Sequence, residues 1–465
     1  MSGLTFGQFI HAAGARADAA VDLSALPFIP STDSRTLRRG ETFVCLRGPN
    51  FDGHRFIQAA VDAGAVAAVV ENGAELGPHA SLPLVRVADT KAAYLQGAAA
   101  ARRLARCTVV GVTGSVGKTT VTAMCAQLLG RRRRVLATPA NENNELGVAK
   151  LCYALSGAPD VAVIEMGARG PGQIAQLVDL ALPDIGVLTN VGEAHLEFFE
   201  DRAALAKTKW ELFGAGARPV LSAADEWSRS LAATAGLGKR ALWIRLCGDP
   251  HAEGLTFESG VPTDGRVPLT FGASHAYAPW HLVGDHHLRD ALLAAGAAIL
   301  AGLTFEEAID GFGDLRLPPG RFEMHVLPSR AVIVYDAYNA SPTSMVHALL
   351  AFAQVPAARR IAVLGSMAEL GADAPAQHES TGAAAARAGV DALYCRGEFA
   401  EALAAGARTA GMSAKSVTVM ASNADVAAAL RATLRDGDAV LLKGSRVQKM
   451  EEILTALLAV EAPAS

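Results

Sequence analysis

The stretch GVTGSVGKTT at residues 111–120 constrains the fold of this 465-residue chain more than any other. The apolar run TVVGV at 108–112 leads into it and predicts a buried β-strand, and the residues from Lys118 to Leu129 predict a helix. Glycines between a strand and a helix let backbone N–H groups approach phosphate oxygens, and the helix N-terminus adds partial positive charge. The stretch therefore predicts a phosphate-binding loop. Its spacing differs from the usual G-x-x-x-x-G-K-[ST], because Val112 stands where the first glycine is expected.

Further strand patterns around this loop predict a doubly wound, mainly parallel sheet. VAVIEMG at 161–167 and DIGVLTNVG at 184–192 are apolar, rich in β-branched residues, and end in glycine and polar residues. Ligand-binding groups of such sheets gather at the carboxyl ends of the strands. Residues 215–283 are richer in glycine and proline, which predicts an antiparallel excursion, and an apolar helix over 285–302 closes the unit.

The chain is long enough for about two to four domains, and its patterns divide it into three. Residues 1–88 contain short strand-like segments and one helical pattern, and residues 89–315 contain the phosphate loop. After Pro318-Pro319-Gly320 the alternation of strands and helices restarts, which predicts a third unit over 316–465. The predicted fold class is α/β throughout.

Composition and charge exclude several classes of protein. The net charge of −4 predicts no polyanionic partner such as nucleic acid, and the basic run 131–134 is interpreted as a solvated helix end. The six cysteines form no C-x-x-C pair, which indicates reduced thiols and argues against a zinc site. The first residues lack a signal-peptide pattern, and no apolar run reaches the about 20 residues of a membrane span. A cytoplasmic protein is therefore expected.

Candidate ligands of a nucleotide and its metal follow from the strand ends. Lys118 is expected to reach the β and γ phosphates, and the Thr119 hydroxyl to ligate Mg²⁺. Glu165 ends one predicted strand and His195 follows another, so both belong at the sheet edge that carries the loop. A buried carboxylate there needs an ion pair or a metal, and a lone histidine is often structural, but their shared edge favours a metal site. Lys209 is interpreted from its helical pattern alone as a surface lysine.

Several stretches, in the same order along the chain, resemble the Mur ligase family, which builds the peptide stem of bacterial peptidoglycan. In its ATP loop the shifted glycine spacing of GVTGSVGKTT is the rule. The resemblance runs over about residues 33–455 and is closest to the branch that adds D-alanyl-D-alanine. Beyond the loop it rests on DSR (33–35), GPNFDGHRFIQAAVDAGA (48–65), NENNELG (141–147), IEMGARGPGQI (164–174), TNVGEAHLEFF (189–199), PPGRFE (318–323), DAYNASPTSMVHAL (336–349), LGSMAELG (364–371) and LLKGSR (441–446).

The resemblance implies a small UDP-binding N-terminal domain, a central ATPase-like domain with a parallel sheet, and a Rossmann-like C-terminal domain. It implies ATP and two Mg²⁺ ions as cofactors, with Lys209 carbamylated so that an amine becomes an oxygen ligand. Implied catalytic residues are Lys118, Glu165, His195 and Lys209, and implied metal ligands are Thr119, Glu165, His195 and Lys209. Implied nucleotide contacts are Gly114, Ser115, Gly117, Lys118, Thr119, Thr120, Asp290, Arg321 and Asp336. Implied substrate contacts are Ser34, Arg35, Asp52, Gly53 and His54 for UDP, and Asn141, Asn144, Asn339, Lys443, Ser445 and Arg446 for the other reactants.

The chain departs from the family's usual residues at several positions. Its GDHHLRDA (284–291) has His287 and Asp290 in place of asparagines, the second of which contacts adenine in the family. An ionised aspartate only accepts hydrogen bonds, whereas asparagine also donates them, so Asp290 is expected to accept from the adenine amino group. The remaining departures concern the peptide acceptor and the incoming amine and leave the ATP chemistry intact; they are Glu142, Ala149, Lys150, Ser341 and Ser366.

The function implied by the resemblance is ATP-dependent amide ligation through an acyl phosphate. D-alanyl-D-alanine would be added to UDP-N-acetylmuramoyl-tripeptide by a monomeric enzyme with small-molecule substrates and no nucleic-acid or membrane partner. A paralogous ligase that joins another amino compound or acceptor is a second hypothesis, which the departures keep open. A non-catalytic nucleotide-binding partner protein is a third hypothesis. The residues that argue against it are the intact Lys118, Thr119, Glu165, His195 and Lys209. The third residue of the peptide stem is open at this stage.

Overall fold

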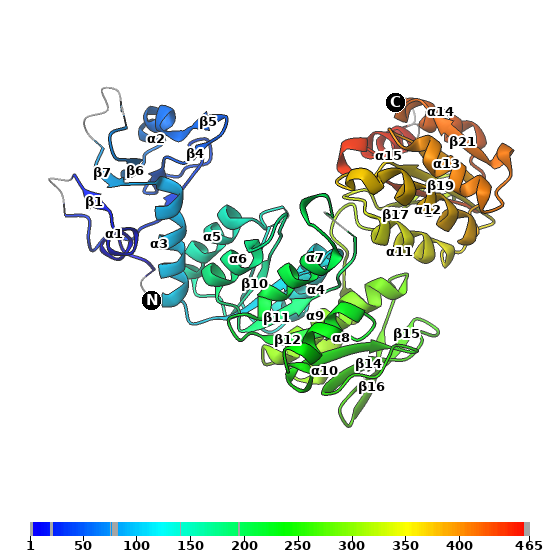
Figure 1. Cartoon of the computed structure of the whole chain (residues 1–465), viewed down its shortest axis with the longest axis horizontal. Helices are drawn as coiled ribbons and strands as arrows, with labels where there is room; N and C mark the ends of the chain where they lie inside the picture. The colour runs from blue at the N-terminus through cyan, green and yellow to red at the C-terminus, as the bar shows by residue number, and fades with distance from the viewer. Residues whose placement is uncertain are drawn as a thin grey trace.

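The computed structural model describes residues 3–18, 22–74, 76, 82–139, 141–193 and 196–459, which fold into three α/β units. Figure 1 shows the units in chain order, with the N-terminal and C-terminal units on either side of the central one. Each unit is built around a sheet of its own, as the restarting strand patterns predict. Within the described ranges no helix is both long and apolar enough to cross a membrane.

The N-terminal unit is a small sheet flanked by helices. Its strand order is β1-β7-β6-β3-β2, and all neighbours pair in parallel except β1 with β7. A separate two-stranded hairpin, β4–β5, lies beside it. The elements are α1 (Phe6–Ala13), β1 (Arg16–Ala17), β2 (Pro30–Ser31), β3 (Thr42–Val44), β4 (Arg47–Gly48), β5 (Phe51–Asp52), α2 (Ile57–Asp62), β6 (Ala67–Glu71), β7 (Leu84–Val87) and α3 (Thr90–Leu104).

One apolar core continues from the N-terminal unit into the central one. Phe28 stacks on Phe9 with ring centroids 3.8 Å apart, and the ring of Tyr153 from the central unit lies 5.9 Å from that of Phe28. The Tyr153 hydroxyl donates a hydrogen bond of 2.7 Å to the Tyr94 carbonyl in α3. Gly97 makes this contact possible, because a Cβ there would lie 2.3 Å from the Tyr153 hydroxyl oxygen. The helix α3 therefore joins the two units through packing.

The central unit has a sheet of order β16-β15-β14-β13-β12-β11-β8-β10-β9. The strands from β9 to β14 pair in parallel, whereas β15 and β16 are antiparallel, which confirms the antiparallel excursion predicted within 215–283. The elements are β8 (Thr108–Thr113), α4 (Lys118–Gly130), β9 (Val135–Ala137), α5 (Glu145–Ala154), β10 (Val161–Glu165), α6 (Gln173–Ala181), β11 (Ile185–Leu188), α7 (Arg202–Trp210), β12 (Arg218–Ser222), α8 (Glu226–Thr234), β13 (Leu242–Leu246), β14 (Leu255–Ser259), β15 (Arg266–Phe271), β16 (Ser274–Pro279), α9 (Asp285–Leu300) and α10 (Phe305–Asp310).

The strand that leads into the phosphate loop lies between two strands that end in polar residues. The β8 residue Val112 is in register with Glu165 of β10, and Thr113 is in register with Leu188 of β11. Because all three strands run in the same direction, their carboxyl ends meet at one edge of the sheet. The loop after β8, Glu165 and the residues after Leu188 therefore lie together at that edge.

The C-terminal unit has the strand order β17-β18-β22-β19-β20-β21, parallel except for the edge strand β17. Its elements are β17 (Glu323–Val326), β18 (Val332–Tyr335), α11 (Pro342–Ala353), β19 (Arg359–Gly365), α12 (Ala374–Arg387), β20 (Ala392–Arg396), α13 (Ala400–Thr409), β21 (Val417–Met420), α14 (Asn423–Thr433), β22 (Asp438–Lys443) and α15 (Glu451–Leu458).

Two helices of this unit, α12 and α13, cross at a pair of glycines. A Cβ on Gly382 of α12 would lie 1.9 Å from the carbonyl oxygen of Leu403, and a Cβ on Gly406 of α13 would lie 1.9 Å from the carbonyl oxygen of Glu379. Both contacts are with backbone atoms, which cannot move aside as a flexible side chain can. The spacing of the two helices therefore depends on the absence of side chains at these positions.

We expect Gly382→Ala to lower the free energy of unfolding by about 1–3 kcal/mol, the usual effect of overpacking a close contact. The urea midpoint of the circular dichroism signal measures it. Gly130→Ala is the matched control, because a Cβ at Gly130 meets no atom of the described chain within 4 Å. An unchanged midpoint for Gly382→Ala would contradict the close crossing of the two helices.

Candidate active site

The phosphate loop owes its shape to two glycines and to the residues after β11. Gly114 and Gly117 have φ of 149° and 87°, a range that favours glycine. A Cβ on Gly114 would lie 1.9 Å from the Thr189 hydroxyl oxygen. That hydroxyl donates to the Val116 carbonyl at 2.5 Å, and Asn190 accepts from the Val116 N–H at 3.1 Å and donates to the Val116 carbonyl at 3.0 Å. The neighbouring strand end thus holds the loop in its cradle shape.

The two residues that begin α4 point their functional groups at this cradle. The Lys118 amine donates to the carbonyls of Gly114 at 2.9 Å and Ser115 at 3.3 Å. Burial lowers the pKa of Lys118, although the charge of Glu165 opposes this shift. The Thr119 hydroxyl accepts a hydrogen bond of 3.3 Å from the Arg321 guanidinium of the C-terminal unit. Lys118 of the central unit and Arg321 of the C-terminal unit therefore meet at the loop, where their charges would stabilise an anion.

Glu165 is buried at the end of β10, and its partner is an amide rather than a cation. The Asn143 side chain donates to Glu165 Oε1 at 2.7 Å, and the Glu165 N–H donates to the Thr138 hydroxyl at 2.9 Å. Glu165 also lines the cavity between the central and C-terminal units. The oxygen chemistry of Glu165 and Thr119 suits Mg²⁺. Within the described part of the chain, no group of three or more His, Cys, Asp or Glu side chains forms a metal site.

Lys209 differs from the surface lysine that its helical pattern indicates. Its side chain on α7 is fully buried, and its amine has no hydrogen-bond partner among the described residues. Burial and the nearby charge of Lys118 lower its pKa to about 7, against the opposing charge of Glu211. An amine with a pKa near 7 is present in both its neutral and its protonated form at physiological pH. His195, the other predicted member of this group, lies outside the described residues.

The C-terminal unit presents its own residues to the loop. The Lys443 amine pairs with Asp336 Oδ2 at 2.7 Å and also donates to the Asn339 carbonyl at 3.3 Å. Asp336 Oδ1 accepts from the N–H of Phe322, the residue after Arg321. Asp336 and Lys443 therefore hold the turn that carries Arg321, while the Asn339 side chain is exposed at the cavity.

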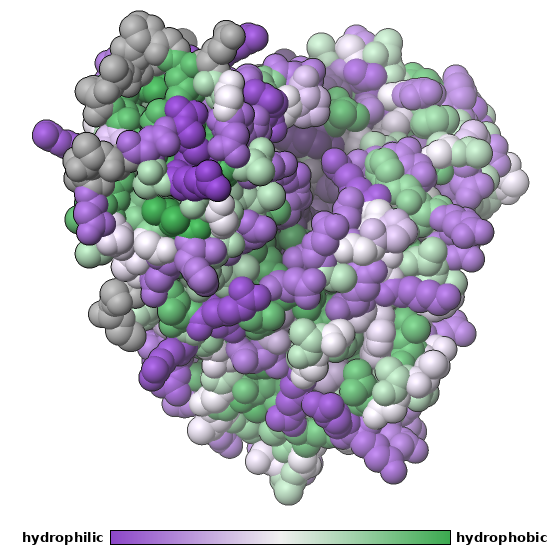
Figure 2. All heavy atoms as spheres, turned by 60° about the vertical axis from the view of Figure 1, so that its left-hand side comes forward, coloured by the Kyte–Doolittle hydropathy of each residue, from purple (hydrophilic) through white to green (hydrophobic). Residues whose placement is uncertain are grey.

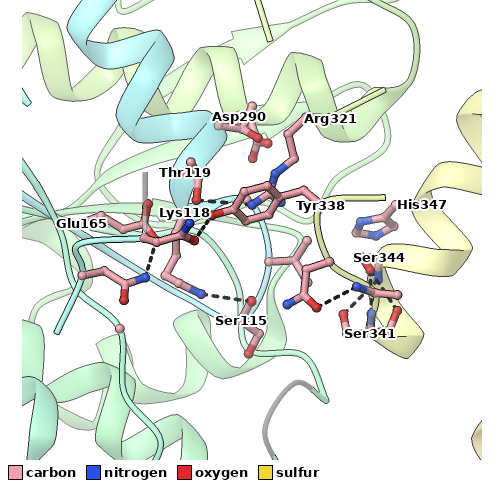
Figure 3. Close-up of a pocket in the computed structure, with 18 of the residues that line it drawn as sticks. Ser115, Lys118, Thr119, Glu165, Asp290, Arg321, Tyr338, Ser341, Ser344 and His347 are labelled. Atoms are coloured by element: carbon pink, nitrogen blue, oxygen red, sulfur yellow. Dashed lines mark hydrogen bonds between the residues drawn. The ribbon is translucent and has the colours of Figure 1, made fainter. Parts of the chain in front are cut away.

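A cavity of about 600 Å³ lies between the central and C-terminal units, and Figure 3 shows its residues converging on the loop. Most predicted nucleotide and amine contacts line it: Ser115, Gly117, Lys118, Thr119, Thr120, Asn141, Asn144, Glu165, Asp290, Arg321, Asp336, Asn339 and Lys443. A second compartment of about 370 Å³ adjoins it and shares Val116, Gly117, His286, Asp290 and His347 with it. The space suits an elongated ligand with a phosphate chain.

Other predicted contacts lie away from this cavity. The five candidate UDP contacts of the N-terminal unit are not among the described residues that line it; they are Ser34, Arg35, Asp52, Gly53 and His54. Asp52 accepts from His54 Nδ1 at 2.6 Å, an interaction that lowers the pKa of Asp52 to about 2, and Arg35 pairs with Asp33 at 2.7 Å. Figure 2 shows a hydrophilic hollow between the N-terminal and C-terminal units, across which a long substrate could reach both regions.

Two further candidates in the C-terminal unit have internal partners. Ser445 donates its hydroxyl hydrogen to the Ser366 carbonyl at 2.7 Å, and Arg446 pairs with Glu451 at 3.0 Å. These bonds occupy the Ser445 hydroxyl and part of the Arg446 guanidinium. Both residues follow directly on β22, whose last residue Lys443 lines the cavity.

Several departures from the family pattern have local structural roles. Glu142 and Lys150 form an ion pair of 2.6 Å with each other, so these two replacements are complementary. Ser341 caps the N-terminus of α11, a role that serine fills as well as asparagine. The Ser366 hydroxyl accepts from the Phe399 N–H at 2.9 Å. Each of these residues therefore makes a local structural contact, and Ser341 also lines the cavity.

Asp290 lies against the phosphate loop, because a Cβ on Gly117 would be 2.8 Å from Asp290 Oδ1. Burial raises the pKa of Asp290 well above its ordinary value, against the charges of Arg321 and Arg289. A protonated carboxyl donates as well as accepts hydrogen bonds. In this environment Asp290 can therefore act as an asparagine would, whereas the sequence alone suggested an acceptor.

Sequence reasoning missed two residues of the site, Asn143 and Tyr338. Asn144 caps α5 by accepting from the Gly147 N–H at 3.0 Å, whereas it is the unselected Asn143 that contacts Glu165. Tyr338, also unselected, stacks on Arg321 and donates to Asn141. The available signal was their place in two quoted motifs, NENNELG and DAYNASP, but adjacent polar residues in a loop cannot be told apart without coordinates.

Comparison with known proteins assigns all three units to one family. Three family models match: the Mur ligase family catalytic domain over residues 29–106, the Mur ligase middle domain over 112–298, and the Mur ligase glutamate ligase domain over 320–446. The chain is 35% identical to the UDP-N-acetylmuramoyl-tripeptide–D-alanyl-D-alanine ligase of Synechocystis sp., covering 92% of this chain and 91% of the relative. It is 32% identical to the Escherichia coli enzyme of the same name, covering 92% and 93%.

Solved structures with the same three-unit fold include MurF from Acinetobacter baumannii, with a TM-score of 0.86 at 24% identity over 99% of both chains. They also include MurF ligase from Thermotoga maritima in complex with ADP, with a TM-score of 0.79 at 27% identity over 94% of this chain and 99% of that one. Full-length similarity at this level, together with a glycine-shaped phosphate loop that meets residues of a third unit, leads to one conclusion. The chain belongs to the Mur ligase family.

Proposed function

We propose that the protein is an ATP-dependent amide ligase that joins D-alanyl-D-alanine to UDP-N-acetylmuramoyl-tripeptide in peptidoglycan precursor synthesis. The observation that carries this proposal is a set of buried donors that are unpaired within the described residues: Ser115 Oγ and Arg321 Nε, from residues that line the cavity, and Lys209 Nζ, whose charge interacts with that of Lys118. An unpaired buried donor costs about 1–3 kcal/mol, so the set favours an anionic ligand such as the phosphates of ATP. The relatives at 30–35% identity that carry this enzyme's name support the choice of substrates.

The proposed reaction has two steps. An oxygen of the tripeptide carboxylate attacks the γ-phosphorus of ATP, the bond from this phosphorus to the bridging oxygen breaks, and ADP leaves. The amine of the dipeptide then attacks the carbonyl carbon of the acyl phosphate, loses a proton, and inorganic phosphate leaves. The phosphate supplies the leaving group that a free carboxylate lacks.

The protein's contribution to the first step is electrostatic. Two anions, a carboxylate and a triphosphate, must approach each other, and Lys118 and Arg321 both contact the loop where that charge gathers. Because Arg321 belongs to the C-terminal unit, the full charge complement forms only when that unit lies against the central one. Closure of the two units would also exclude water, which protects an acyl phosphate from hydrolysis.

The donor set around the loop fits Mg²⁺ and a carbamylated lysine. We propose that Thr119 holds one Mg²⁺, and that Glu165, His195 and a carbamate on Lys209 hold a second. Bound Mg²⁺ would supply positive charge that offsets the phosphate oxygens. Lys209 suits carbamylation because a neutral amine reacts with CO₂, and the lowered pKa of about 7 leaves much of it neutral. The amine also lacks a partner in the described structure that would compete.

The remaining substrate contacts are proposed by region. We place the UDP group at the N-terminal unit around Ser34, Arg35, Asp52, Gly53 and His54, and the dipeptide near Asn339, Lys443, Ser445 and Arg446. Asn141 and Asn144 lie on the central side of the cavity between them. A single chain supplies all these regions, so we propose a monomeric enzyme, and we propose a cytoplasmic location on the basis of its nucleotide substrates.

The proposed ligation predicts phosphate release that depends on every substrate. With purified protein, ATP, Mg²⁺ and UDP-N-acetylmuramoyl-tripeptide, adding D-alanyl-D-alanine should start steady release of phosphate and formation of the pentapeptide product. Lys118→Ala should lower the rate by at least about 10²-fold, because one preorganised charge at the transition state is lost. Dipeptide-independent release by the wild-type protein would rule out this choice of amine.

Lys209→Ala should abolish ligation, and a short-chain carboxylate such as acetate should partly restore it by replacing the carbamate oxygens. Lys207→Ala is the matched control, because Lys207 lies two residues earlier on the same helix and is exposed. Full activity of Lys209→Ala would contradict the proposed role of the lysine.

The pKa of Lys209 also predicts a dependence on pH and CO₂. The amine is protonated below about pH 7 and neutral above it, and only the neutral amine takes up CO₂. In CO₂-depleted buffer, wild-type activity should therefore fall most steeply below pH 7, and added bicarbonate should restore it. A carbamate signal in ¹³C NMR after labelling with ¹³C-bicarbonate, absent from Lys209→Ala, checks the assignment without any activity measurement.

A further inference from the structure

We propose that Tyr338 is a positioning residue that fixes the Arg321 guanidinium at the phosphate loop and links the C-terminal unit to the central one. This inference deepens the proposed function and rests on it, because it concerns how the charge of Arg321 reaches the bound phosphates. It is carried by the contacts that Tyr338 makes at both ends of its ring.

The first contact is with Arg321. The guanidinium carbon of Arg321 lies 4.3 Å from the centroid of the Tyr338 ring, and Figure 3 shows the ring lying over the end of the arginine beside Thr119 and Lys118. A ring in this position covers one face of the guanidinium and leaves its N–H edges free. One edge nitrogen, Nη2, donates to Thr119, and Nε has no partner in the described chain. The stack therefore orients the arginine without occupying the donors that an anion would use.

The second contact is with the central unit. The Tyr338 hydroxyl donates a hydrogen bond to Asn141 Oδ1. Asn141 has a φ of 70°, a left-handed conformation that asparagine adopts more readily than most residues, so its amide is presented by an unusual backbone shape. Burial raises the pKa of Tyr338, so the hydroxyl keeps its proton and remains a donor. Tyr338 thus reaches from the C-terminal unit to the NENNELG segment.

Tyr338 and Arg321 belong to one piece of the C-terminal unit. The Tyr338 N–H donates to the Gly320 carbonyl at 3.2 Å, and Phe322 N–H donates to Asp336 two residues before Tyr338. The turn that carries Arg321 and the loop that carries Tyr338 are therefore tied by hydrogen bonds on both sides of the arginine. When this piece meets the central unit, Arg321 reaches Thr119 and Tyr338 reaches Asn141 together.

The ring and the hydroxyl of Tyr338 should therefore have different effects on the reaction. An arginine has several rotatable bonds, and an unsupported guanidinium must lose that freedom as charge develops on the phosphates. The Tyr338 ring restricts it beforehand, so its loss should affect the rate at saturating ATP. The hydroxyl contributes to the contact between the units, so its loss should mainly affect the nucleotide concentration needed.

Three variants of the full-length protein separate these effects. Tyr338→Phe keeps the ring and removes the hydroxyl, and Tyr338→Leu removes both. Tyr277→Leu is the matched control, because it removes a tyrosine with a similar arginine contact, 5.8 Å from Arg266, on strands away from the cavity. Melting temperatures of all variants establish that each is folded.

In the ligation assay we expect Tyr338→Leu to lower kcat by about 10-fold, a loss between those of an exposed and a desolvated cation–π contact, because both residues are half-buried. Tyr338→Phe should keep kcat within about threefold of wild type while raising KM for ATP, since the ring remains. Tyr277→Leu should match wild type. In an Arg321→Ala background, Tyr338→Leu should cause no further loss of kcat, because the two residues act as one unit. The proposal would be overturned if the losses of kcat in the two single variants multiplied in the double variant. It would also be overturned if Tyr338→Leu kept the kcat of the wild-type protein.

Binding of a non-hydrolysable ATP analogue with Mg²⁺, measured by calorimetry, tests the same coupling without the ligase reaction. Tyr338→Leu should weaken binding more than Tyr338→Phe does in the wild-type background, and no more than Tyr338→Phe does in Arg321→Ala, because only the ring acts through the arginine. Tyr338→Phe and Asn141→Ala break the same hydrogen bond, so the double variant should bind as the weaker single one does. If the wild-type protein bound the analogue but ligated nothing, the proposed choice of substrates would be wrong. The coupling between Tyr338 and Arg321 would still be tested by the binding measurements.

Discussion

The close contact between the phosphate loop and the end of β11 is the constraint on which the rest of the site depends. Thr189 and Asn190 fill the space that a side chain at position 114 would need, and their side chains bond to the backbone of Val116. This contact holds the glycine-rich segment in a cradle shape around the Lys118 amine. It also explains the unusual spacing, because Val112 belongs to the buried strand and the cradle begins only at Gly114.

The cradle collects positive charge that the fold does not neutralise. Lys118 belongs to the central unit and Arg321 to the C-terminal unit, and Lys209 adds a buried amine that is only partly protonated; burial lowers the pKa of both lysines. Such an arrangement is unfavourable in an empty protein, since buried cations and unpaired donors lack the stabilisation of water. It becomes favourable when phosphates bind, so the site exchanges some stability of the unliganded fold for affinity towards anions. The meeting of two units at this point means that the same anion also favours their closed arrangement.

The sequence was a good guide wherever a local pattern has one structural outcome. Buried β-branched runs predicted the strands β8, β10 and β11, and a glycine and proline-rich stretch predicted the antiparallel excursion. The expectation that Glu165 shares a sheet edge with the loop followed from parallel strands alone, and the structure confirms it. The pattern around Lys209 misled, because neighbouring lysines on one helix look alike until packing buries one of them and leaves Lys207 exposed. Within loops such as NENNELG, no periodicity separates the residue that contacts Glu165 from the one that caps a helix.

By itself the sequence determined the α/β class, the order of the three units, the phosphate loop and the residue types gathered around it, because each follows from hydrophobic periodicity, glycine geometry or a contiguous motif. Only the tertiary structure decided which polar side chains contact one another and which of them are buried. Asn143 meets Glu165, Tyr338 meets Arg321, and Asp290 is buried against Gly117 so that its carboxyl favours the protonated state. These relations join residues from about 20 to 170 positions apart along the chain, and their strength depends on burial, a property of the packed molecule that no single segment contains.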